Sequence, residues 1–267
     1  MPKFAANLTL LFTDRPFLER FEAAAQAGFE AVECQFPYEH SAQEVASVLK
    51  ASGLPMVLHN LPAGDWAAGD RGLACDPLRA DAFLNSLPLA MEYAQALSVP
   101  RLNCLVGLQP PHCCAAEAWH TTVRNAKVAA RLLATQGLEL VLEPINHHDV
   151  PGFFISHTND MLRLIDEIDQ PNVKLQFDVY HATRMGEDVL PTLQRVLPRV
   201  GHLQMADVPG RHEPGSGQMD FATLFKALDE WGYAGWVGCE YHPANLGALG
   251  TEAGLGWRQR LASVIAS

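Results

Sequence analysis

Short apolar runs alternate with helical patterns along this chain, and several of the runs end abruptly in a polar side chain. The clearest covers residues 140–142, which are followed directly by Glu143 and Pro144. A short apolar run that stops at a helix breaker is typical of a strand buried on both faces of a parallel sheet. The carboxylate would then lie where the strand opens into a loop, the edge at which parallel α/β folds place their chemistry.

The same pattern recurs three times in the second half of the chain. Residues 173–177 precede Asp178, residues 201–203 precede Gln204, and residues 236–239 precede Glu240. The intervals of about 25 to 35 residues fit one strand plus one crossover helix, so every strand would point its last polar side chain at one face. A single acid of this kind is more often a helix cap or a partner in a rim salt bridge. Four polar side chains, each at the end of one of four successive strands, favour a shared site.

Over the whole chain the patterns predict eight strands in alternation with about eight helices. The predicted strands cover residues 4–8, 31–34, 55–58, 100–106, 140–142, 173–177, 201–203 and 236–239. The predicted helices cover residues 17–28, 41–51, 77–96, 115–136, 158–168, 189–196 and 221–232, with a last one from about residue 251. We therefore predict a single (β/α)8 TIM barrel domain over residues 1–267. A doubly wound open sheet would more often carry a glycine-rich phosphate turn after its first strand, which is absent here.

One segment breaks the alternation. Residues 61–76 are too long and too rich in glycine for an ordinary connection between a strand and a helix. Long loops in compact domains are usually functional or disordered, and Trp66 argues against disorder. We predict a lid over the site.

The composition of the chain limits the kinds of partner that it is expected to bind. The 267 residues are 48% hydrophobic and 18% charged, and the formal net charge is −11, which is unfavourable for binding nucleic acid or an anionic membrane. No apolar run is long enough to span a bilayer, and the start of the chain lacks the apolar run of a signal peptide. The six cysteines show no CxxC spacing. We expect reduced thiols in the cytoplasm.

The four strand ends together supply three carboxylates and one amide oxygen. Oxygen ligands without cysteine suit a hard divalent cation, Mg²⁺ or Mn²⁺. Three carboxylates crowded together would repel one another, and a metal removes that conflict. We predict Glu143, Asp178, Gln204 and Glu240 as metal ligands, and the amide of Gln204 favours Mg²⁺.

Two glutamates beside a metal suit proton transfer next to a carbonyl group, one as base and one as acid. His59 and His181 lie just beyond strand ends, where they would contact substrate or make rim hydrogen bonds. Arg211 is the candidate partner of a substrate carboxylate, because a guanidinium binds it bidentately. Its alternative is a salt bridge to Glu213.

Several stretches resemble the hydroxypyruvate isomerase family, which belongs to the xylose isomerase-like barrels together with sugar epimerases and endonuclease IV. The similarity covers essentially the whole chain. The stretches that carry it are residues 58–69 (LHNLPAGDWAAG), 142–146 (LEPIN), 201–204 (GHLQ) and 235–241 (GWVGCEY).

The resemblance implies a β/α barrel that interconverts hydroxypyruvate and tartronate semialdehyde, with catalytic glutamates at Glu143 and Glu240. For the wider superfamily it implies metal ligands at Glu143, Asp178, Gln204 and Glu240. Two positions depart from the pattern. Gln204 stands where the superfamily often has histidine, and His242 stands where the family pattern has lysine. If His242 helps to hold a substrate carboxylate, its charge depends on pH.

Other functions stay open at this point. The nearest is 2-oxo-tetronate isomerase, with the same chemistry on a longer keto acid. A sugar 3-epimerase is disfavoured by Gln204, and a metal-dependent nuclease by the net charge of −11. A barrel that only binds a metabolite is disfavoured by the glutamate pair. The expected partner is a small hydroxy or keto acid, and a homo-oligomer is possible.

Overall fold

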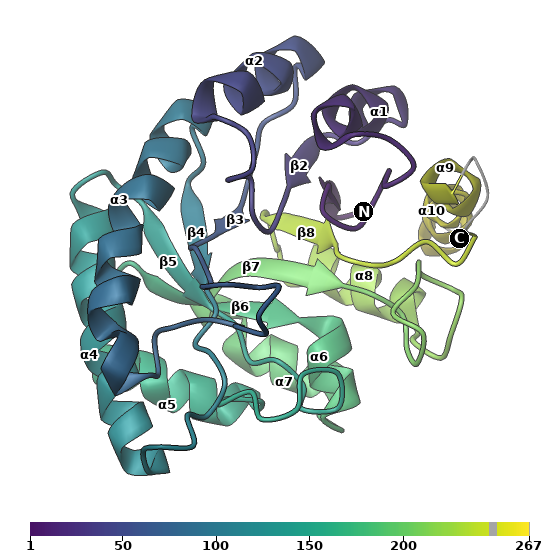
Figure 1. Ribbon diagram of the computed structural model, residues 1–267. Coiled ribbons are helices and arrows are strands. Elements are labelled where there is room, and N and C mark those ends of the chain that lie inside the picture. Colours follow the sequence, from purple (N-terminus) through teal and green to yellow (C-terminus); the bar gives the residue numbers. More distant parts are fainter. Residues whose placement is uncertain (246–249, 267) are drawn as a thin grey trace.

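A computed structural model describes residues 1–245 and 250–266. Eight parallel strands form one sheet in the order β2-β1-β8-β7-β6-β5-β4-β3 (Figure 1). Strands that are consecutive in the sequence lie side by side and β8 returns to β1, while β2 and β3 are the two ends of this order. The strands are β1 (Lys3–Asn7), β2 (Ala31–Glu33), β3 (His59–Asn60), β4 (Arg101–Cys104), β5 (Glu139–Leu142), β6 (Val173–Asp178), β7 (Val200–Met205) and β8 (Trp236–Cys239). The barrel prediction is confirmed.

The circle closes between β2 and the residues that lead into β3. Val32 donates its main-chain N–H to Pro55 O at 3.0 Å, and Val57 donates to Val32 O at 2.9 Å. Elsewhere the ladders are continuous, apart from one irregularity between Leu175 and Gln176 where β6 pairs with β7. A closed parallel barrel brings the carboxyl ends of all its strands to one rim.

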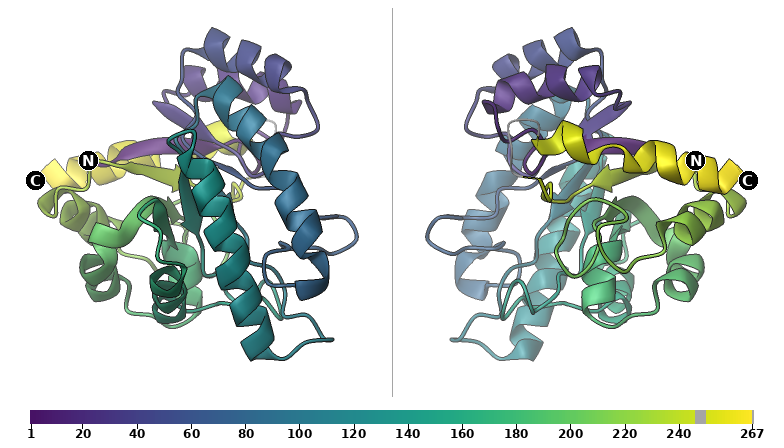
Figure 2. Two further views of the ribbon diagram at one scale, coloured as in Figure 1. Left: turned by 90° about the vertical axis from the view of Figure 1, so that its left-hand side faces the viewer. Right: turned by 90° about the vertical axis from the view of Figure 1, so that its right-hand side faces the viewer.

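Helices surround the barrel and cover its outer face (Figures 1 and 2). The α-helices are α1 (Arg20–Gln26), α2 (Ala42–Ser52), α3 (Ala80–Leu97), α4 (Ala115–Ala134), α5 (Thr158–Ile168), α6 (Val179–Arg184), α7 (Val189–Val196), α8 (Phe221–Glu230), α9 (Gly250–Gly254) and α10 (Trp257–Ala266). Short 3-10 turns precede α1 and α3 and follow α7: η1 (Phe17–Glu19), η2 (Pro77–Arg79) and η3 (Leu197–Arg199).

Most predicted elements appear within a few residues of their expected bounds, and α5, α7 and β8 match them fully. Helix α2 begins with a capping box formed by Ser41 and Glu44. Two predictions were wrong. Of the strand expected at residues 55–58, only Met56 forms an isolated bridge, to Val32, and β3 begins at His59. The single last helix is divided into α9 and α10. The short helix α6 was not predicted.

The main hydrophobic core lies between the helices and the outside of the sheet. A second, smaller apolar cluster is formed only by residues in the strands or directly before them, which places it inside the barrel. Its buried members are Ala5, Ala31, Val57, Leu58 and Val141, with Trp236 packed against them.

Inside the barrel the character of the side chains changes within two residues. Strand side chains alternate between faces with a period of two, so residues i and i+2 share a face. Two residues beyond four members of this inner cluster, each strand carries a polar side chain that is almost fully buried. The pairs are Ala5 and Asn7, Ala31 and Glu33, Val57 and His59, and Val141 and Glu143. The barrel is therefore apolar at one end and polar at the end where the strands finish.

Among the described residues, none of the helices has the length and apolar character needed to cross a membrane. All six cysteines are free thiols. Cys104 and Cys239 lie on strands and are buried, as is typical of cysteines that act as small apolar side chains.

The polar interior leads to a test of packing at Gly238. A Cβ on Gly238 would lie 2.4 Å from both carboxylate oxygens of Glu33, which is itself fully buried. We expect Gly238→Ala to lower the free energy of unfolding by about 1–3 kcal/mol, because an overpacked core has no free space to take the added methyl group. Urea denaturation measures this change. The control is Gly256→Ala, where the new Cβ meets only the end of the exposed Arg260 side chain, and a change within about 0.5 kcal/mol is expected. Equal effects at the two positions would contradict this account of the interior.

Candidate active site

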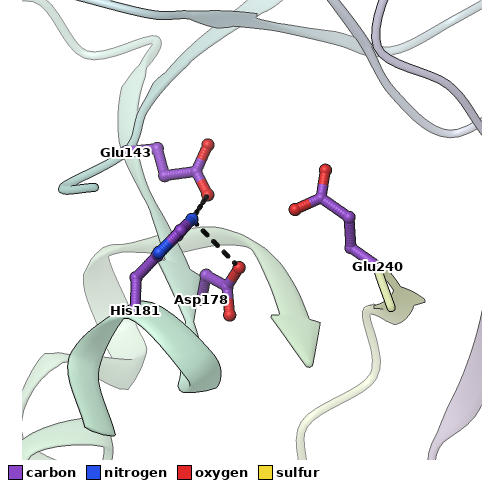
Figure 3. Close-up of side chains that lie close together, drawn as sticks. All are labelled: Glu143, Asp178, His181 and Glu240. Atoms are coloured by element: carbon purple, nitrogen blue, oxygen red, sulfur yellow. Dashed lines mark ion pairs between the residues drawn. The ribbon is translucent and has the colours of Figure 1, made fainter. Parts of the chain in front are cut away.

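Four buried side chains meet at the rim where the strands end (Figure 3). Glu143 follows β5, Asp178 ends β6, His181 lies in α6, and Glu240 follows β8. One ligand atom from each lies within 4.8 Å of the others, a spacing that can hold a metal ion. We call these four residues the acidic cluster. Glu143, Asp178 and Glu240 were predicted as metal ligands, and His181 as a substrate contact.

Two oxygens of the acidic cluster are buried without a hydrogen-bond partner in the part of the chain that the structure describes. They are Glu143 Oε1 and Asp178 Oδ2, and both face His181 Nε2, at 3.8 and 3.6 Å. Buried polar atoms without partners are costly and rare in native proteins. A divalent cation would satisfy both oxygens together, so the residues present fit a metal of the oxygen-binding class.

The other oxygens of the cluster are held in place. Asn103 Nδ2 donates to Glu143 Oε2 at 2.9 Å, and the Tyr180 N–H donates to Asp178 Oδ1 at 2.7 Å, which caps α6. Each of these two carboxylates is therefore fixed through one oxygen and free through the other.

Glu240 is held more completely than the other two acids. Its Oε1 accepts from Gln35 Nε2 at 3.0 Å and from Asn7 Nδ2 at 3.3 Å, and its Oε2 accepts from Arg211 Nη2 at 2.6 Å. Asn7 also donates to Glu33 Oε1 at 2.9 Å, so Glu240 is connected to the polar interior of the barrel.

Burial and mutual repulsion disfavour ionisation of the cluster. Burial first, and then the charges of Glu240 and Asp178, raise the pKa of Glu143 well above its usual value. Burial also raises the pKa of Asp178, to about 7, and that of Glu240. A bound cation reverses this tendency, because it favours the ionised form of every carboxylate around it.

His181 is oriented by Asn146. The Asn146 amide is fixed by Asp149, whose N–H donates to Asn146 Oδ1 at 2.9 Å and whose Oδ2 accepts from Asn146 Nδ2 at 3.1 Å. Asn146 Nδ2 is thereby directed at His181 Nδ1, at 2.7 Å. Nδ1 then accepts, and the ring proton lies on Nε2, which faces Glu143 and Asp178. Burial lowers the pKa of His181 well below its usual value, so the ring is a neutral donor. This favours contact with a substrate oxygen over metal ligation.

Gln204 is buried with both ends of its amide in hydrogen bonds. Its Oε1 accepts from Gln176 Nε2 at 2.6 Å, and its Nε2 donates to Glu33 Oε1 at 2.7 Å. Glu33 Oε2 lies 2.6 Å from His202 Nε2. Gln204 therefore belongs to a polar network inside the barrel, and its place among the metal ligands stays a prediction.

Arg211 lies against the acidic cluster. Besides its bond to Glu240, its Nη2 is 3.9 Å from Asp178 Oδ2, and its guanidinium lies over the Tyr180 ring at 5.1 Å. In the described part of the chain the alternative salt bridge to Glu213 is absent, and Glu213 accepts instead from the Ala244 N–H at 2.9 Å. Arg211 is thus placed to meet an anion bound beside the cluster.

The two remaining predicted contacts are neutral histidines. His59 is fully buried, with Nδ1 3.1 Å from Asn60 O and 3.2 Å from Tyr38 Oη, and burial lowers its pKa to about 4. Its Nε2 has no hydrogen-bond partner among the described residues. Burial, and then the charges of Arg211 and His212, lower the pKa of His242, whose main-chain N–H donates to Arg211 O at 2.9 Å. Contact of either with substrate stays a prediction.

The predicted lid carries its tryptophan at the surface. Trp66 is 42% exposed, with the Arg71 guanidinium 4.0 Å from its ring and Phe36 at 5.2 Å between ring centroids. Phe36 is the neighbour of Gln35, which binds Glu240, so the loop packs next to the site. Closure over a ligand stays a prediction.

The amide side chains that hold the cluster were not predicted from the sequence. They are Asn7, Gln35, Asn103 and Asn146. Asn7 and Asn103 follow the period of two along β1 and β4, a signal that could have found them. Gln35 and Asn146 lie in loops, for which no such signal exists.

Comparisons with known proteins identify the family of the chain. The family model described as Xylose isomerase-like TIM barrel matches residues 21–262. The chain is 45% identical to the hydroxypyruvate isomerase of Escherichia coli (strain K12), over 96% of this chain and 98% of that relative. It is 44% identical to the 2-oxo-tetronate isomerase of Cupriavidus necator, over 96% of this chain and 97% of that relative.

Solved structures show the same fold. A crystal structure described as AP endonuclease, family 2, from Brucella melitensis has a TM-score of 0.93 and 40% sequence identity, and covers 97% of this chain and 99% of that one. A 3-keto-D-glucoside 4-epimerase from E. coli has a TM-score of 0.78 at 22% identity, again over 97% and 99%, and shows the fold alone. The chain belongs to the xylose isomerase-like TIM barrel family.

Proposed function

We propose that this protein is an isomerase that interconverts hydroxypyruvate and tartronate semialdehyde. The observation that carries the proposal is the pair Glu143 and Glu240, which face each other across the acidic cluster from β5 and β8 (Figure 3). Aldose–ketose isomerisation needs a base for one carbon and an acid for its neighbour. The 45% identity to a relative named hydroxypyruvate isomerase supports the same substrate.

In the reaction one glutamate takes a proton from C3, the hydroxymethyl carbon of hydroxypyruvate. The electrons of that C–H bond form a double bond between C3 and C2, and the ketone oxygen becomes negative. The other glutamate delivers a proton to C2, while the hydroxyl proton on the C3 oxygen passes to the C2 oxygen and C3 becomes an aldehyde. Atoms and charge balance, and neither oxidant nor reductant is needed.

The acidic cluster would hold a divalent cation through Glu143, Asp178 and Glu240, with Gln204 as the further predicted ligand. Oxygen donors without sulfur favour Mg²⁺, with Mn²⁺ as the alternative. Such a cation supplies Lewis acidity that stabilises negative charge on a substrate oxygen.

The other side chains around the cluster bind and orient the substrate. Arg211 pairs with the substrate carboxylate, and the Nε2–H of His181 donates to the oxygen that becomes negative. His59 and His242 contact the substrate as neutral groups, so the positive charge at this end of the site comes from Arg211.

The closest alternative is 2-oxo-tetronate isomerase, since a relative of that name is 44% identical. The chemistry is the same and the acid is longer, so relative turnover of the two acids decides between them. A nuclease is disfavoured because a chain with net charge −11 is poorly suited to a polyanion.

Removal of the metal tests the proposed function. We expect the purified protein to isomerise hydroxypyruvate, to lose about 100-fold or more of its kcat after EDTA treatment, and to regain it with Mg²⁺ or Mn²⁺, since Lewis-acid stabilisation is worth several kcal/mol. Activity unaffected by EDTA would remove the metal from the reaction. Turnover of 2-oxo-tetronate in place of hydroxypyruvate would reassign the substrate.

Substitution of the glutamates tests their role. We expect Glu143→Gln and Glu240→Gln each to lower kcat by about 10²–10⁴-fold, because an amide cannot accept the proton, while circular dichroism shows an unchanged fold. Glu92→Gln, an exposed change on α3, is the matched control and should keep full activity. A fully active Glu240→Gln enzyme would refute the two-glutamate mechanism.

Metal binding should depend on pH. In the metal-free protein the raised pKa values, about 7 for Asp178, keep the cluster partly protonated at neutral pH. A cation binds the ionised form, so its binding releases protons and its affinity rises with pH. Between pH 6 and pH 8 we expect the affinity for Mn²⁺ to rise about 10-fold through the ionisation of Asp178 alone, and further through that of Glu143. Calorimetry in buffers of different ionisation enthalpy counts the protons, and a count of zero would mean that the cluster is already ionised.

A further inference from the structure

We propose that Asp207 is a positioning residue for Arg211, acting through the loop that joins them. Asp207 lies two residues beyond the end of β7 and is fully buried. No contact of its side chain with the acidic cluster is found among the described residues. Its effect on the reaction is therefore indirect, and only the activity assay below rests on the proposed function.

The Asp207 carboxylate accepts hydrogen bonds from four main-chain N–H groups of the following loop. Its Oδ1 accepts from the N–H groups of Val208 and Met219, at 2.9 and 3.0 Å. Its Oδ2 accepts from those of Gly215 and Gly217, both at 2.9 Å. Hydrogen bonds to an ionised acceptor are stronger than neutral ones, and here one buried carboxylate accepts from four main-chain donors of the loop. Residues 208–219 thus form a loop whose two arms are tied to a single side chain.

Close packing supports the same anchor. A Cβ on Gly217 would lie 1.9 Å from Val208 O and 2.7 Å from Asp207 Oδ1, so only glycine fits there. The loop is also closed by main-chain bonds, from the Asp207 N–H to His212 O at 2.8 Å and from the Gln218 N–H to Val208 O at 3.0 Å. These bonds leave little freedom to the residues between them.

Arg211 lies in this loop and has a conformation that needs support. Its φ of +56° is in the left-handed region, which costs a residue with a side chain about 1 kcal/mol or more. The His242 N–H donates to its carbonyl oxygen at 2.9 Å. With the main chain in this conformation, Arg211 Nη2 lies 2.6 Å from Glu240 Oε2. The Asp207 carboxylate therefore sets where the positive charge of the site lies.

The test is a double-mutant cycle with Asp207→Asn and Arg211→Ala. The asparagine amide keeps one acceptor oxygen and turns an NH₂ group toward main-chain donors, so the loop loses about half of its anchor. We expect kcat/KM for hydroxypyruvate to fall about 10- to 100-fold in Asp207→Asn, and to change less than about 2-fold when the same substitution is made in Arg211→Ala. Equal losses in both backgrounds would overturn the proposal.

Asp220→Asn is the matched control. Asp220 also accepts main-chain hydrogen bonds beside this loop, from Thr223 at 3.0 Å, but as the N-cap of α8. We expect it to lower the melting temperature and to leave kcat/KM unchanged. If Asp207→Asn does not fold, Gly217→Ala opens the loop with the carboxylate intact, and the same cycle applies to it.

A second measurement does not depend on the substrate. The Nε–H signal of Arg211 in a ¹⁵N correlation spectrum is identified by its loss in Arg211→Lys. We expect this signal to be sharp in the unaltered protein and in Asp220→Asn, and broadened or shifted in Asp207→Asn. An unchanged signal would overturn the proposal even in a protein that turns over hydroxypyruvate. A broadened signal would support it even in one that does not, which keeps the two proposals separable.

Discussion

The structure depends on one constraint, the burial of three carboxylates within a few ångströms of one another at the rim of the barrel. Water would normally solvate these charges, and its loss is expensive. Hydrogen bonds from the surrounding residues offset part of this cost. Glu143 accepts from Asn103, Asp178 accepts from the main chain at the start of α6, and Glu240 accepts from Asn7, Gln35 and Arg211. What these donors leave unsatisfied is one oxygen each on Glu143 and Asp178. These two unsatisfied oxygens are the atoms of the site that are available to a metal ion.

Much of the fold could be predicted because local patterns and the global fold agree. Helix α5 shows its apolar stripe clearly, and β8 is a short apolar run bounded by Gly235 and Glu240. The error at residues 55–58 has a physical origin. Met56, Val57 and Leu58 are buried as expected, but burial does not decide whether main-chain bonds form a regular ladder on both sides. Helix α6 was missed because its six residues are too few to show a period.

The candidate site, like the fold, could be predicted only in part. The acids could be found because each follows a strand, and the barrel brings strand ends together whatever the loops do. The partners of Arg211 and His181 could not, since they depend on loop conformation. The sequence suggested Glu213 as the salt-bridge partner of Arg211. In the structure the main chain of Arg211 is in the left-handed region, and its side chain pairs with Glu240. For Gln204 the residue type was readable but not the direction of its amide, which Glu33 and Gln176 decide.

The missing side chain of Gly238 has a consequence beyond stability. The space that a Cβ would fill is taken by the carboxylate of Glu33, which binds Asn7, His202 and Gln204. Positions 33 and 238 therefore share one volume, although 205 residues separate them in the chain. We expect a homologue with a side chain at 238 to carry a shorter residue at 33, and thereby to lose the acceptor that directs the amide at 204. These three positions should accordingly vary together during evolution, as a unit.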